Sequence, residues 1–134
     1  MDQHIPHIDA FTALGEFLRT HKKGKGDQTH NSLEEVIQKA SLKNPWFTSE
    51  NCEQALQWWS ECLIPERISS WLSTYKIPAK QSKTVALVMA GNIPLVGFHD
   101  LLCVLLSGHK ALIKLSSKDY VLLPFLLNYL IEQD

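Results

Sequence analysis

The spacing of apolar residues changes a little past the middle of this 134-residue chain. In the first part, apolar residues recur every three or four positions, which is the spacing of an amphipathic helix. This pattern predicts helices over about residues 5–21 and 32–44. Thr48 and Pro65 begin two more, because Thr is a favoured N-cap and Pro suits the first turn of a helix. We therefore expect residues 1–78 to form a helical N-terminal segment.

In the second part, short apolar runs alternate with a longer apolar segment of helical spacing. The run from Val85 to Ala90 predicts a strand that is covered on both faces of a parallel sheet. Leu95 to Leu106 predicts a helix that ends at Gly108, a favoured C-cap residue. Ala111 to Leu115 predicts a second strand, and Asp119 can cap a last helix. The order strand–helix–strand–helix indicates an α/β fold.

This α/β part, residues 79–134, is small for a sheet domain, because a sheet usually has about four to six strands. The last predicted helix also carries many apolar residues that need cover, namely Leu122, Leu123, Phe125, Leu126, Tyr129 and Leu130. We therefore expect the chain to be an N-terminal fragment that packs against the remainder of its own chain. A complete small domain that forms a homo-oligomer through its sheet edge is the alternative.

Composition excludes several classes of protein. The formal net charge of −1 gives no basic face for nucleic acid. The three cysteines Cys52, Cys62 and Cys103 lack metal or disulfide spacing, which predicts reduced thiols in a cytoplasmic protein. The six His residues are scattered, so no metal site is expected. No apolar run is long enough to span a membrane.

Two polar residues follow the two predicted strands. Asn92 lies in the turn after the first strand, and Lys114 lies at the end of the second. Ligands of parallel sheets bind at the carboxyl ends of the strands, so these residues mark a candidate site. From residue type alone, Asn92 could instead be a simple turn residue and Lys114 a solvated strand end.

The same positions carry a family resemblance. The chain reads Ala90-Gly91-Asn92-Ile93-Pro94 before the helix and Gly108-His109-Lys110-Ala111-Leu112-Ile113-Lys114-Leu115-Ser116-Ser117 after it. This order resembles the aldehyde dehydrogenase superfamily, whose members have Trp-Asn-aromatic-Pro and, later, Lys-Pro-Ser-Glu. In this chain Gly91 replaces the Trp, and Ser117 replaces the Glu. With these two replacements the sequence resembles the LuxC-type acyl-CoA reductases, a divergent branch of the superfamily. The resemblance covers residues 83–134 well and implies a Rossmann-like nicotinamide-binding domain.

The resemblance implies roles for individual residues. Asn92 would be the catalytic residue that donates its amide N–H to the substrate oxyanion. The residues that would bind the cofactor are Lys114, Ser116, Ser117, Gly91 and Ile93.

Ser117 stands where NAD-preferring members of the superfamily place a Glu that accepts the ribose hydroxyls. Loss of that carboxylate removes repulsion against a 2′-phosphate, to which Lys114, Ser116 and Lys118 can donate. The expected cofactor is therefore NADPH rather than NADH.

The implied reaction reduces a fatty acyl-CoA or acyl-protein to an aldehyde through a Cys thioester, which belongs to fatty acid metabolism. The family nucleophile would lie beyond Asp134, so we expect the isolated chain to be inactive and to bind cofactor weakly. Cys103 is a rival nucleophile, because His99 lies one helical turn before it. Two other functions remain open: an interaction module without catalysis, and an unrelated nucleotide-binding enzyme in which Lys114 meets a phosphate.

Overall fold

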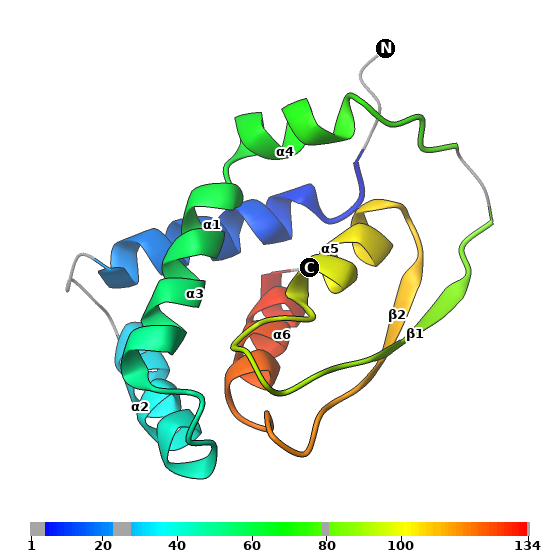
Figure 1. The fold of residues 1–134 in the computed structure, drawn as a ribbon. Helices are drawn as coiled ribbons and strands as arrows, with labels where there is room; N and C mark the ends of the chain where they lie inside the picture. The colour runs from blue at the N-terminus through cyan, green and yellow to red at the C-terminus, as the bar shows by residue number, and fades with distance from the viewer. Residues whose placement is uncertain (1–4, 23–27, 79–80, 134) are drawn as a thin grey trace.

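A computed structural model describes residues 5–22, 28–78 and 81–133 of the chain (Figure 1). Within these residues the fold is helix-rich α/β with a two-stranded parallel sheet. The elements in chain order are α1 (Ile8–Lys22), α2 (Gln28–Lys43), α3 (Ser49–Cys62), α4 (Pro65–Leu72), β1 (Thr84–Val88), α5 (Phe98–Leu106), β2 (Lys110–Lys114) and α6 (Leu122–Gln133). None of the described helices is long and apolar enough to cross a bilayer.

The predicted helix ends are confirmed where a local cap determines them. The Thr48 hydroxyl accepts a hydrogen bond of 3.1 Å from the Asn51 amide at the start of α3, and Pro65 is the first residue of α4. After α5, Gly108 has φ +88°, a left-handed conformation that suits glycine. Asp119 Oδ1 accepts from two backbone amides, those of residues 122 and 123, and so caps α6.

The strands pair in parallel, with Thr84 opposite Lys110 and Val88 opposite Lys114. Helix α5 connects them and contacts both strands, so the predicted strand–helix–strand unit is confirmed (Figure 1). The boundaries differ slightly, since α5 begins at Phe98 rather than Leu95. Residues 92–97 form turns instead, in which Leu95 adopts a φ of 60°.

The prediction that both faces of the first strand are covered is wrong for the described residues. One face contacts the core, whereas on the other face Val88 of β1 is 79% exposed and Leu112 of β2 is 64% exposed. A short apolar run is compatible with a strand covered on both faces and with one covered on a single face, so its composition alone could not distinguish the two. The larger Rossmann-like sheet implied by the resemblance is also not seen in these residues, which form two strands.

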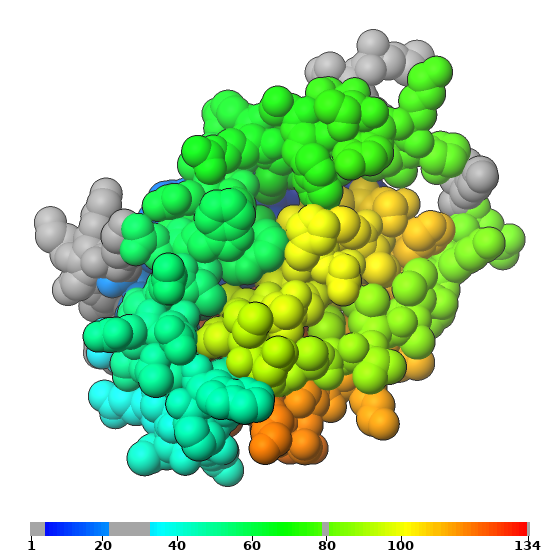
Figure 2. All heavy atoms as spheres, viewed as in Figure 1, coloured from blue at the N-terminus to red at the C-terminus, as the bar shows by residue number. Residues whose placement is uncertain are grey.

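Residues from both parts of the chain build one hydrophobic core. Phe98 of α5 makes edge-to-face contacts with Phe11 of α1 and Trp59 of α3, at ring-centre distances of 6.0 and 4.7 Å. Helix α6 packs on α1 and α2, and Tyr129 stacks on Phe17 at 4.7 Å. Figure 2 shows the green surface of α3 and α4 directly against the yellow surface of α5. The apolar face of α6 therefore packs against the N-terminal helices.

Candidate functional site

The turns that follow the two strands lie against each other at one end of the sheet. The Met89 amide donates a hydrogen bond of 3.0 Å to the Lys114 carbonyl, which extends the pairing beyond β1. Gly91 is buried in this contact, and a Cβ atom at this position would overlap Ser116 Oγ and Lys118 Cβ. Glycine is needed here because the side chains of Ser116 and Lys118 lie directly against its backbone. The structure thus brings Gly91 and Ser116 together, and their role in cofactor binding stays a prediction.

Asn44, the residue directly after α2, forms hydrogen bonds to both turns. Its side-chain Nδ2 donates to the carbonyl oxygens of Gly91 at 2.9 Å and Lys118 at 3.1 Å. Its Oδ1 accepts from the Trp46 amide at 3.0 Å, and the residue is only 2% exposed. A buried side-chain amide with three partners holds its neighbours in one arrangement. Asn44 is therefore a positioning residue that the sequence predicted only as a helix end.

Asn92 follows Gly91 and is exposed to solvent. It lines an open groove of about 920 Å³ between one side of α3, with the residues just before that helix, and the turn at residues 92–95. Ile93 lines the same groove and is 55% exposed. An amide group at this position is accessible to a ligand, and the oxyanion role of Asn92 stays a prediction.

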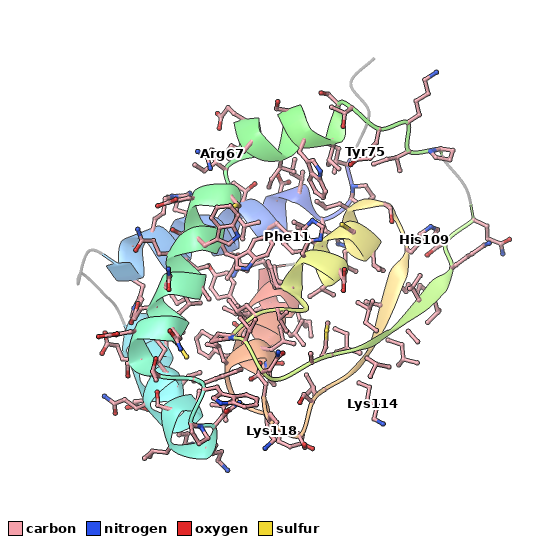
Figure 3. All side chains as sticks on the ribbon, in the orientation of Figure 1. Phe11, Arg67, Tyr75, His109, Lys114 and Lys118 are labelled. Atoms are coloured by element: carbon pink, nitrogen blue, oxygen red, sulfur yellow. The ribbon has the colours of Figure 1, made fainter. Side chains whose placement is uncertain are left out.

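Lys114, Ser116 and Ser117 form the other half of the predicted site and do not line that groove. Lys114 is exposed at the end of β2, and Ser117 is exposed in the turn. The Ser116 hydroxyl accepts a hydrogen bond of 3.1 Å from the Lys118 amide. In Figure 3, Lys114 and Lys118 both extend outward at the lower edge of the molecule. The segment therefore presents two ammonium groups and two hydroxyls within five residues.

Cys103 lies beside His99, with its Sγ 3.8 Å from His99 Nδ1, as the sequence predicted. The electrostatic environment opposes activation, however. Burial, and then the Asp100 carboxylate, raise the pKa of the Cys103 thiol. A thiol with a raised pKa is mostly protonated at neutral pH and is a poor nucleophile.

The other two thiols are no more reactive. Burial, Asp119 and Glu53 raise the pKa of Cys52 to about 11, and its side chain is fully buried in the core. Burial also raises the pKa of Cys62, although Arg67 opposes this shift. The pKa of each of the three thiols is therefore shifted away from the thiolate form that acts as a nucleophile.

A second cavity, of about 430 Å³, lies beside Cys103 between α4 and α5. Its lining includes Tyr75, His99 and His109, of which Figure 3 labels Tyr75 and His109. His109 Nδ1 accepts a hydrogen bond of 3.1 Å from the Lys83 amide. This contact connects the segment before β1 to the residue before β2, which is a structural role.

Three helices also bring together one histidine and two carboxylates. His21 of α1, Glu34 of α2 and Glu53 of α3 place one ligand atom each within 4.8 Å of one another, a spacing that could hold a cation. His21 Nε2 lies 3.4 Å from Glu53 Oε1. Sequence spacing could not reveal this cluster because each residue lies on a different helix. That the protein needs no metal stays a prediction.

Comparison with known proteins gives one family match. Residues 69–134, a little under half of the chain, match the family model of acyl-CoA reductase (LuxC). The matched range contains both strands, the turn with Asn92 and the segment with Lys114. Comparison with curated proteins and with solved structures gave no match. Asn44 and most of the helical segment lie outside the matched range.

Proposed function

We propose that the chain is the N-terminal part of an NADPH-dependent fatty acyl-CoA reductase that forms an aldehyde through a Cys thioester. The observation that carries this proposal is the family match over residues 69–134, in which Asn92 follows β1 and Lys114 ends the parallel strand β2. The carboxyl ends of such strands are the usual place for ligands of an α/β sheet.

Asn92 is proposed as the oxyanion donor. When a thioester is reduced, its carbonyl oxygen gains negative charge as the carbon becomes tetrahedral. An amide N–H that is already directed at that oxygen stabilises the charge without reorganising. The exposed position of Asn92 in the groove supports this role, because substrate can reach the side chain.

The strand-end segment is proposed to bind the cofactor. Its donors, which come from Lys114, Ser116, Ser117 and Lys118, fit a 2′-phosphate, because ammonium groups and hydroxyls both donate to phosphate oxygens. The set contains no carboxylate that would repel this group. Gly91 packs against Ser116, which places the Asn92 turn beside the proposed cofactor site. NADPH supplies the hydride for the reduction.

The nucleophile is proposed to lie C-terminal to Asp134. A Cys thiolate there would attack the acyl carbon, and CoA would leave as its thiolate. After reduction, the thiohemiacetal would collapse to release the aldehyde and restore the Cys thiolate. The raised pKa values of the thiols at positions 52, 62 and 103 support an external nucleophile. We accordingly expect the isolated 134-residue chain to lack reductase activity.

The test is acyl-CoA-dependent oxidation of NADPH by the protein translated from the whole reading frame. We expect Asn92→Ala to lower kcat by about two to three orders of magnitude. Asn128→Ala is the matched control, since Asn128 is exposed on α6 outside the site and should keep full activity. Full activity in Asn92→Ala, or no reductase activity in the parent protein, would contradict the proposal.

An interaction module is the second candidate, and the open sheet face favours it. Val88 and Leu112 are large apolar residues that solvent reaches in this structure. If this face binds a second copy, the chain sediments as a dimer and Leu112→Lys sediments as a monomer. If the chain is a monomer at all concentrations, this face no longer supports an interaction module.

A further inference from the structure

The groove beside Asn92 is built mainly by residues outside the family match. Three large apolar side chains line it and are more than half exposed: Trp46 at 60%, Trp58 at 59% and Ile93 at 55%. The tryptophans come from the helical segment, whereas Ile93 comes from the turn after β1. Residues distant in sequence therefore concentrate exposed apolar surface in the groove that the Asn92 amide also lines. Such a concave apolar surface with a few polar groups is typical of a ligand site.

The side chains that line the groove indicate which part of a bound substrate or cofactor it fits. None of the described residues that line the groove is charged, and its polar side chains are Asn51, Gln54 and Asn92. The phosphates of CoA and of NADPH are anionic and would find no cation here. A hydrocarbon chain would cover the two indole rings and Ile93, leaving its carbonyl end near Asn92.

We infer that this groove binds the acyl chain of the thioester substrate, and that Trp46 and Trp58 set the preference for chain length. This inference rests on the proposed reductase function. It assigns a substrate-binding role to the helical segment.

The Trp46 side of the groove is fixed in place by hydrogen bonds. The Trp46 amide donates to Asn44 Oδ1 at 3.0 Å, and its carbonyl accepts from Asn51 Nδ2 at 3.1 Å. Both bonds use the Trp46 backbone, so truncation of the ring leaves them intact. A preformed wall lowers the entropy that a ligand must lose on binding. The same Asn44 side chain holds the Gly91 turn, so it positions both walls.

The test is equilibrium binding of acetyl-, octanoyl- and myristoyl-CoA to the 134-residue chain, below the micellar concentration of each. Free CoA is the reference ligand. We expect affinity to rise about twofold to threefold per added methylene, below the roughly fourfold of full burial because the groove is open. Tryptophan fluorescence reports binding directly. Equal affinity for all three thioesters would overturn the inference.

Substitutions then locate the site. We expect Trp58→Ala and Trp46→Ala to weaken myristoyl-CoA binding about tenfold, a typical loss for an aromatic anchor, and to leave binding of free CoA unchanged. Tyr120→Ala is the matched control, because Tyr120 is an aromatic residue that is 62% exposed and outside the groove. Circular dichroism verifies that each variant is folded. Trp58→Phe keeps an aromatic ring and should recover part of the affinity that Trp58→Ala loses. Unchanged myristoyl-CoA affinity in both folded Trp→Ala variants would overturn the inference.

Activity of the protein from the whole reading frame separates this inference from the proposed function. Reductase activity with a loss in Trp58→Ala that is confined to long-chain substrates supports both. If the parent protein is a reductase and Trp58→Ala loses equal activity with acetyl- and myristoyl-CoA, the proposed function is supported and the acyl-chain inference is overturned. If binding depends on chain length but the protein has no reductase activity, the groove binds acyl chains and the proposed function is overturned. A protein segment as the true occupant would appear as no binding of any thioester, which also overturns the inference.

Discussion

At the scale of single residues, Asn44 contributes most to the geometry of the site. Its one side-chain nitrogen donates to Gly91 and Lys118, which are 47 and 74 positions away in the sequence. Asn92 and Lys114 could be predicted because neighbouring residues form a recognisable order around them. Asn44 could not, because its partners become neighbours only in the folded chain. Its sequence context, the end of a helix before a proline, indicates a helix terminus and nothing more.

We predict that Asn44→Ala lowers the free energy of unfolding by about 2–4 kcal/mol, because it leaves buried polar groups without their partner. Asn51→Ala is the matched control, since Asn51 Nδ2 donates a single exposed hydrogen bond to the Trp46 carbonyl. That variant should lose about 1 kcal/mol or less. Urea denaturation measures both. Equal losses in the two variants would show that Asn44 does not hold the turns.

Lys114 allows a second prediction at this scale. If it binds the 2′-phosphate, Lys114→Ala should weaken NADPH binding about tenfold, the loss of one charge-assisted contact, and change NADH binding little. Lys110→Ala is the control, because Lys110 is exposed at the other end of β2. Calorimetric titration of the protein from the whole reading frame measures both cofactors. NADH binding as tight as NADPH binding in the parent protein would contradict the proposed preference.

At the scale of elements, caps were predictable and the covering of the sheet was not. Thr48, Gly108 and Asp119 act on backbone groups within a few residues, so the local sequence determines them. The burial of a strand depends instead on what lies above and below it. The run at residues 85–90 therefore predicted a strand correctly but its surroundings wrongly.

The cap of α6 leads to a prediction with a pH dependence. Asp119 is 5% exposed, and burial raises its pKa although backbone amides oppose the shift. A raised pKa means that ionised Asp119 stabilises the fold less than the protonated form, so its contribution falls as pH rises through the folded-state pKa. Asp119→Asn keeps the acceptor without the charge. It should match or exceed the parent stability at neutral pH, and this advantage should shrink in acid.

Asp119→Ala removes the acceptor as well and should lose about 1–2 kcal/mol, a typical value for an N-cap. Denaturation with urea at neutral and acidic pH compares the three proteins. An Asp119→Asn protein that is less stable than the parent at neutral pH would mean that the charge itself stabilises α6.

At the scale of the whole molecule, the two parts of the chain depend on each other through the core. Phe98 packs between Phe11 and Trp59, and α6 covers α1 and α2. The sequence predicted a boundary near residue 78 because the period of apolar residues changes there. A change of period marks a change of secondary structure, which need not coincide with a division between cores. Whether the parts are separate domains stays a prediction.

We predict that residues 1–78 alone do not unfold cooperatively, since the fragment loses α5 and α6 as partners of its apolar face. Circular dichroism during urea denaturation should show a broad, shallow change, whereas the 134-residue chain should show a sharp transition. A sharp transition at the same urea concentration in the fragment would instead establish the helical segment as an independent domain.

The position of Asn44 directly before Pro45 has a consequence for the chemical ageing of the protein. Spontaneous deamidation of asparagine begins when the next backbone nitrogen attacks the side-chain carbonyl, after losing its hydrogen. Proline has no hydrogen on that nitrogen, so the reaction is blocked at this position. Deamidation here would replace the shared donor with a carboxylate that faces the carbonyl oxygens of Gly91 and Lys118. Pro45 therefore protects the Asn44 side-chain amide, on which both turns depend, from this route of deamidation.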